Sequence, residues 1–131
     1  MKKSLVMKLK CFIDYKIKNN EENIEKKDLK AIKTDNTVSY EDDNERIKLI
    51  INNKDIIMEK DNLSSTITMN FKNNEKTKGK YLIKPLNSYL DMTINTEVLE
   101  ISDSKIYIEY EIWLEEEYTG KFKYEVIIKE V

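Results

Sequence analysis

The chain has 131 residues, 37% of them charged, and its net charge is −2 because Lys and Arg nearly balance Asp and Glu. This balance argues against nucleic acid or an anionic membrane as a partner, since both are bound through a broad positive field. The chain has no His and one Cys, which excludes imidazole-based triads, His or thiolate metal sites and internal disulfides. The length suits one domain, residues 1–131, around a single core.

The start of the chain predicts a cytoplasmic protein. Lys8 and Lys10 interrupt the apolar residues of segment 1–11, so we expect neither a signal peptide nor a membrane span. Cys11 alternates in step with its apolar neighbours, which indicates a small buried side chain rather than a nucleophile, and its lone thiol fits a reducing compartment. Abundant Lys, Asn and Ile suggest an AT-rich coding bias and a bacterial origin.

The N-terminal segment predicts the longest strand of the chain, because its apolar residues occupy every second position. These residues are Leu5, Met7, Leu9, Cys11, Ile13, Tyr15 and Ile17. After a polar turn, segment 24–32 predicts a weaker strand. A helix over 21–33 is the alternative, since Ile24, Asp28 and Ala31 would share one helical face, and we favour the strand.

The middle of the chain predicts five short strands separated by polar turns, over 37–40, 47–51, 56–60, 63–71 and 77–84. The acidic run 41–45 predicts a loop, and segment 52–55 predicts a tight hairpin because Asn tolerates positive φ.

Two positions in these strands carry specific expectations. Leu63 begins an apolar face that continues through Ile67, Met69 and Phe71, so we expect it to point inward. Gly79 lies inside a strand, where glycine often marks a bend or a close backbone approach.

The C-terminal third predicts the clearest meander. Segment 85–87 suits a type I turn whose third residue, Asn87, is left-handed, and a change of parity predicts a bulge near 97–99 in the next strand. Strands over 106–114 and 121–129 follow, and we expect the turn between them at 118–120.

About ten short strands with short connections predict an all-β fold, a single antiparallel up-and-down barrel of about eight to ten strands. Connections of this length suit antiparallel pairing, and closure removes exposed sheet edges. The apolar parity of the clearest strands predicts one common core that contains Leu9, Ile13, Ile67, Met92, Ile94, Ile108, Ile112 and Val126.

The residues of the last strands resemble the YwiB-like family, small bacterial proteins of uncharacterised function with a calycin-like or lipocalin-like β-barrel. The resemblance rests on Tyr81, Pro85, Leu86, Asn87, Leu90, Met92, Ile94, Thr96, Leu99, Ile106, Ile108, Tyr110, Ile112 and Leu114. The family pattern has Thr before the proline and an aromatic-Gly pair after it, from which Lys84, Leu86 and Asn87 depart. The resemblance implies the barrel fold and no activity, cofactor or catalytic residue.

Five tyrosines are the candidate site residues, because each falls on an inward parity and brings a hydroxyl into the barrel. They are Tyr15, Tyr40, Tyr81, Tyr110 and Tyr124. We predict that they line a site for a small apolar or amphipathic molecule; the alternative is that they fill the barrel ends with their hydroxyls in water.

An alternative function is a structural or interaction module whose barrel is filled. Trp113 is predicted on the outer face beside Glu109 and Glu111, where it would anchor a protein partner or a second copy of the chain. The carboxylates of segment 109–117 are the remaining candidates for enzyme chemistry, and we interpret them as a solvated strand face. We predict no catalytic residue, metal or cofactor.

Overall fold

The computed structural model describes residues 8–130, which form ten antiparallel strands closed into one barrel. The strands are β1 (Leu9–Lys18), β2 (Asn23–Lys33), β3 (Thr37–Asp42), β4 (Glu45–Asn52), β5 (Asp55–Asp61), β6 (Ser65–Phe71), β7 (Lys76–Ile83), β8 (Ser88–Ile101), β9 (Lys105–Leu114) and β10 (Glu117–Glu130). Each strand pairs with the next along the chain, and β10 pairs with β1 to close the barrel. The predicted fold class is therefore confirmed.

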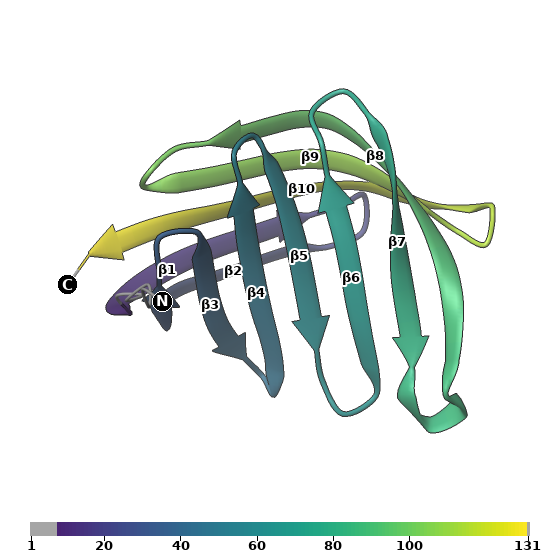
Figure 1. The fold of residues 1–131 in the computed structure, drawn as a ribbon, viewed down its shortest axis with the longest axis horizontal. Helices are drawn as coiled ribbons and strands as arrows, with labels where there is room; N and C mark the ends of the chain where they lie inside the picture. The colour runs from purple at the N-terminus through teal and green to yellow at the C-terminus, as the bar shows by residue number, and fades with distance from the viewer. Residues whose placement is uncertain (1–7, 131) are drawn as a thin grey trace, which may run out of the picture.

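The barrel wall consists of two sets of strands that cross at a steep angle (Figure 1). Strands β3 to β7 are short and run nearly vertically in this view, whereas β1, β2, β9 and β10 run nearly horizontally. The long strand β8 curves from one direction into the other, and its pairing with β9 shifts between Thr96 and Val98. This shift is the bulge that the parity change near 97–99 predicts, and it increases the local bend of the strand.

The second strand forms as predicted, and the helix alternative over 21–33 is wrong. Strand β2 pairs with β1 along its length, and Ala31 is buried in the barrel. A register shift in this ladder coincides with a positive φ at Asp28, so the strand contains an irregularity that its weak alternation reflects. In β1 the described strand begins at Leu9, and the predicted strand residues Leu5 and Met7 lie outside the described residues.

Two turns differ from the prediction. The loop expected over 41–45 is only the pair Asp43-Asn44, because positive φ angles at both residues produce a tight hairpin. The turn expected at 118–120 is formed instead by Glu115 and Glu116, which also adopt positive φ, and the Gly120 region is a bulge inside β10. Two consecutive Glu residues are poor indicators of such a turn, which explains the error.

The predicted turn at 85–87 and the predicted role of Gly79 agree with the structure. Residues Lys84–Leu86 form a 3₁₀ turn, Asn87 is left-handed at φ 46°, and its N–H donates to the carbonyl of Lys84. A Cβ added to Gly79 would lie 2.5 Å from the carbonyl oxygen of Thr68, so a side chain there would force the two strands apart.

The core contains most of the predicted residues. Ile13, Ile94, Ile108 and Val126 are fully buried, and Met92 and Ile112 are nearly so. The complete buried set is Cys11, Ile13, Ala31, Val38, Tyr40, Ile47, Leu49, Ile56, Met58, Met69, Phe71, Met92, Ile94, Ile106, Ile108, Tyr110, Ile112, Tyr124, Val126 and Ile128.

Three residues that were predicted to point into the core are more exposed than expected. Leu9 is half exposed, because the described ladder between β1 and β10 begins only at Cys11. Leu63 is 92% exposed, since the Asn62 side chain accepts hydrogen bonds from the backbone N–H groups of the two residues after Leu63 and holds the segment as a turn before β6. Ile67 is only partly buried, although it packs against the core.

Candidate ligand-binding site

The barrel interior contains one charged side chain in a row of apolar and aromatic ones. Strand register aligns this row across seven strands as Ala31, Tyr40, Ile47, Lys60, Ile67, Tyr81 and Leu90. Lys60 follows the buried Ile56 and Met58 on the same face of β5, so it points into the barrel and not to solvent. An inward cation at this position is unusual, because charged side chains are rarely buried unless paired.

Lys60 borders a cavity of about 200 Å³ at one end of the barrel, which we call the mouth cavity. Strands β1, β2, β3, β4, β5 and β10 and the β1–β2 turn contribute its walls, through Tyr15, Ile17, Asn19, Glu22, Ile24, Tyr40, Glu45, Ile47, Lys60, Phe122 and Tyr124. Apolar side chains and tyrosines make up seven of these eleven residues, and the other four are polar or charged. Such a mixed lining suits a small molecule that is itself amphipathic.

Three of the five predicted tyrosines meet at the mouth cavity. The Tyr40 and Tyr124 hydroxyls share a hydrogen bond of 2.6 Å, and both residues are buried. The ring of Tyr15 lies 5.5 Å from that of Tyr40, and its hydroxyl donates to Asp42 at 2.6 Å. Asp42 is in turn close to the Lys26 ammonium, at 3.7 Å. These contacts fix the three rings, so one wall of the cavity is preorganised.

Burial keeps these hydroxyls protonated. It raises the pKa of Tyr40 and that of Tyr124 above the ordinary value. Burial also raises the pKa of Tyr15, and the hydrogen bond to the Asp42 carboxylate adds to the effect. Since one proton is enough to join Tyr40 and Tyr124, the other hydroxyl of the pair keeps a proton that is available to an acceptor in the cavity.

The Lys60 ammonium has no ion-pair partner among residues 8–130. The nearest acidic influence is Glu45, a partly buried residue of β4 that also lines the mouth cavity. One Glu45 oxygen accepts a hydrogen bond of 3.0 Å from the Asn62 amide. Desolvation lowers the pKa of Lys60, and the charge of Glu45 opposes this shift only in part.

The other two predicted tyrosines lie elsewhere. Tyr110 is buried deeper, where its ring stacks on Phe122 at 5.4 Å and meets Phe71 edge-on at 4.8 Å. Tyr81 is half-buried and packs against the core without reaching the mouth cavity. Sequence parity therefore places all five rings on the inner side but does not show which of them come together.

Lys60 is the site residue that the sequence analysis missed. The signal is present, because Ile56, Met58 and Lys60 share one parity in a strand that was predicted over 56–60. Lysine at a strand end is ordinarily solvated, so the sequence alone predicts a solvent-exposed side chain at this position.

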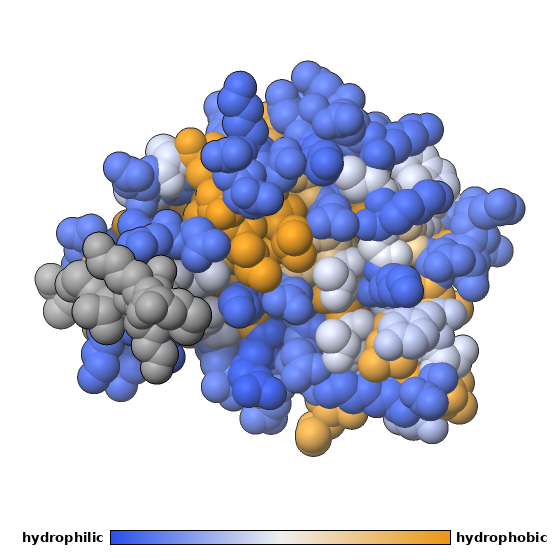
Figure 2. All heavy atoms as spheres, in the orientation of Figure 1, coloured by the Kyte–Doolittle hydropathy of each residue, from blue (hydrophilic) through white to orange (hydrophobic). Residues whose placement is uncertain are grey.

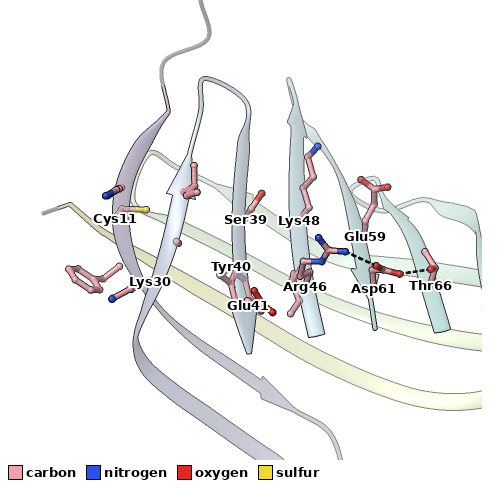
Figure 3. Close-up of a pocket in the computed structure, with 15 residues that line it drawn as sticks. Cys11, Lys30, Ser39, Tyr40, Glu41, Arg46, Lys48, Glu59, Asp61 and Thr66 are labelled. Carbon is pink, nitrogen blue, oxygen red and sulfur yellow. Dashed lines mark hydrogen bonds and ion pairs between the residues drawn. The ribbon is translucent and has the colours of Figure 1, made fainter. Parts of the chain in front are cut away.

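A larger concavity lies on the outer surface of the barrel. This outer groove has a volume of about 1000 Å³ and crosses the outside of β1 to β6 (Figure 3). Most of its lining residues have the outward parity, and Arg46 and Thr66 both donate hydrogen bonds to Asp61 along it. Hydrophilic side chains cover most of the face in Figure 2 and leave a limited hydrophobic patch. The groove is larger than the mouth cavity and more open to solvent, and Arg46 and Asp61 form an ion pair on its wall.

Trp113 lies on the outer face, as the alternation of β9 predicts. It is half-buried because the ring of Tyr118 meets it edge-on at 5.3 Å and the Lys76 ammonium lies 5.6 Å from its centroid. The Tyr118 hydroxyl of β10 donates to Glu111 and the Tyr107 hydroxyl donates to Glu109, so both acidic residues beside Trp113 have hydrogen-bond partners. Trp113, Tyr118 and Lys76 thus form a small cluster on the outer face.

Other kinds of site receive no support from residues 8–130. No three Asp, Glu or Cys side chains of this segment converge in a way that would hold a metal ion, and no helix in it is long and apolar enough to span a membrane.

Comparison with known proteins supports the fold. No protein-family model and no curated protein sequence matches this chain. Among solved structures, it is similar to the crystal structure of the YwiB protein from Bacillus subtilis, with a TM-score of 0.61 over 96% of this chain and 93% of that one. The sequence identity is 12%, so the likeness shows a shared fold alone. At that level it confirms the resemblance inferred from the last strands.

Proposed function

We propose that this barrel binds a small amphipathic molecule in the mouth cavity, with the apolar body against Ile17, Ile24 and Phe122 and the polar group near Tyr40 and Tyr124. The observation that carries the proposal is the convergence of three ordered tyrosines and an inward lysine on one partly open cavity. The sequence predicts a ligand inside the barrel, without a position. The proposal assigns it to one end, because the middle of the barrel is filled by buried side chains.

The cavity volume limits the ligand. About 200 Å³ corresponds to roughly seven volumes of about 30 Å³, the share of one water molecule in the liquid. A ligand of about seven or eight non-hydrogen atoms that gains about 0.5 kcal/mol per atom binds with a Kd near 1 mM. This is smaller than the ligands that lipocalin-like barrels with hollow interiors would hold, and the binding assay must detect weak complexes.

Titration with hexan-1-ol, followed by NMR, tests the proposal. We expect saturable shift changes at Tyr15, Tyr124 and Phe122, which line the mouth cavity and not the outer groove, and at Tyr40, which lines both. Ile24→Trp, at the exposed edge of the cavity, should block them by filling the space, whereas Ile32→Trp, at a comparably exposed position of the outer groove, should not. Shifts confined to the outer groove, or equal binding by the Ile24→Trp protein, would contradict the proposal.

The second candidate function is an interaction module that uses the cluster of Trp113, Tyr118 and Lys76. The filled barrel middle and the ordered aromatic pair on the outer face favour it. Large aromatic rings beside a cation are common anchors at protein interfaces. If a homodimer uses this face, quenching of Trp113 fluorescence by acrylamide should fall as the protein concentration rises. If quenching does not depend on the protein concentration, ligand binding in the mouth cavity is the better-supported function.

We also propose that the protein is cytoplasmic, as its sequence predicts. The supporting observation is that Cys11 is buried and that burial raises the pKa of its thiol, so this lone cysteine is suited to remain reduced.

A further inference from the structure

We propose that the ligand of the mouth cavity is a monocarboxylate with a short apolar body, and that Lys60 is the residue that recognises its carboxylate. This inference rests on the proposed function and adds the charge of the ligand. It starts from an unusual combination in the structure: an inward ammonium without an ion-pair partner among the described residues, beside a partly open cavity with free volume.

The strand register shows why Lys60 has no partner of its own. Its neighbours on the two adjacent strands are Ile47 and Ile67, which are apolar. The acidic residues beside it on β5, Glu59 and Asp61, have the outward parity, and Asp61 pairs with Lys84 at 2.8 Å. An ammonium in such a position loses hydration without a compensating contact, which an anion from solution can supply.

The charges around the cavity favour one negative charge on the ligand. Lys60 supplies one positive charge, while Glu45 on β4 and Glu22 in the β1–β2 turn also line the cavity. These three side chains give the lining a net charge of −1, so a monocarboxylate, which adds one negative charge next to Lys60, is opposed less than an anion of higher charge. A phosphate monoester, with a charge between about −1.5 and −2 at neutral pH, would add repulsion against Glu45 and Glu22.

Hydroxyl groups supply the second contact. Tyr15 donates its proton to Asp42, so it has none left for a ligand. The pair Tyr40 and Tyr124 retains one free proton, on the wall of the same cavity. A carboxylate has two acceptor oxygens, so it can accept from Lys60 through one and from this tyrosine pair through the other.

The test compares hexanoate with hexan-1-ol, which has the same apolar body without the charge, by NMR titration of the full chain. We expect Lys60→Met to weaken hexanoate binding by about tenfold or more, the effect of losing a hydrogen bond to a charged group, and to leave hexan-1-ol binding within about twofold. Lys60→Arg should retain most of the preference for hexanoate. Lys48→Met, which removes an exposed lysine from the neighbouring strand, should change neither ligand.

Two further arms test the charge argument. Glu45→Gln removes a carboxylate from the cavity wall and should strengthen hexanoate binding by a few-fold without strengthening hexan-1-ol binding. Hexyl phosphate should bind more weakly than hexanoate, and tighter binding of the phosphate would overturn the assignment of a monocarboxylate.

The results separate this inference from the proposed function. If hexan-1-ol binds in the mouth cavity but hexanoate is no tighter, or if Lys60→Met weakens both ligands equally, the role of Lys60 is wrong and the ligand site stands. If neither probe shifts the mouth tyrosines, the site itself is wrong. Thermal unfolding of each variant shows whether the barrel remains folded.

Discussion

The middle of the barrel and its mouth are built from the same alternating strands but differ in their contents. In the middle, side chains such as Leu49, Met58 and Ile94 are completely buried and fill the space between opposite walls. At the mouth, Tyr15, Phe122 and Lys60 are only partly buried and a cavity remains between them. The comparison shows that inward parity decides which side chains enter the barrel, whereas only those beside the mouth cavity stay partly accessible.

This difference follows from the geometry of a closed barrel. Strands of a barrel are tilted and staggered, so inward positions near strand ends face an opening rather than an opposite wall. A residue with an apolar body and a polar tip suits such a position, because it packs along its length and turns its tip toward the cavity. Tyrosine and lysine both have this character, and both occur at the mouth.

The first prediction compares the effect of the same truncation, Ile to Ala, in the middle of the barrel and at the mouth. Ile108→Ala in the middle should reduce the free energy of unfolding by about 2 to 5 kcal/mol, because Ile108 is fully buried and its neighbours cannot close the cavity. Ile24→Ala at the mouth should cost less than about 1 kcal/mol, since Ile24 is already 37% exposed. Urea unfolding of both variants measures the difference, and equal losses would show that the two regions are packed alike.

The packed middle was largely predictable from the sequence. A period of two in 106–114 and 121–129 identifies the inner face, and nothing in a closed barrel overrides it at Ile108 or Val126. The bulge of β8 was equally predictable, because an apolar residue that changes parity inside a strand requires one extra residue.

Strand ends were less predictable, since parity continues past the point where pairing stops. Leu63 has the inward parity of β6, but the hydrogen bonds to the Asn62 side chain hold a turn there, so the strand begins only at Ser65. Leu9 has the parity of Cys11 and lacks a described β10 partner opposite it. Both errors arise because tertiary pairing, rather than the pattern, decides where a strand ends.

The candidate site was predictable in its residue types but not in its arrangement. Tyr15, Tyr40 and Tyr124 were identified one by one, and their grouping depends on strands β1, β3 and β10, which only the closure of the barrel brings together. A charge on an inward parity, as at Lys60, is a usable signal for further sequences of this kind.

The second prediction uses Lys60 to make the mouth more like the middle. Lys60→Met replaces an inward charge by an apolar side chain of similar length, so it should raise the free energy of unfolding near pH 7 by about 1 to 3 kcal/mol, the cost of desolvating an unpaired polar group. The part of the gain due to the charge should be complete below the lowered folded-state pKa of Lys60 and should vanish as the pH rises past about 10.4, where lysine is neutral in both states.

Urea unfolding at several pH values measures this gain, with Lys48→Met as the control for an exposed lysine on the neighbouring strand. A loss of stability in the Lys60→Met protein would mean that the ammonium is well solvated and that the mouth is open at this position.

The third and smallest effect concerns the hydrogen bond between Tyr40 and Tyr124. Tyr40→Phe and Tyr124→Phe should each cost about 1 kcal/mol, because each leaves the other buried hydroxyl without its partner. The double variant should cost less than the sum of the two, and the difference gives the coupling between the hydroxyls. Tyr110→Phe is the matched control from the packed middle, where burial is the only influence on the pKa of the Tyr110 hydroxyl. Loss of this hydroxyl should change the free energy of unfolding by less than about 0.5 kcal/mol. Additive losses for Tyr40 and Tyr124, equal to that of Tyr110, would show that the mouth tyrosines act as packing residues only, and the preorganised polar wall on which the ligand site depends would have to be abandoned.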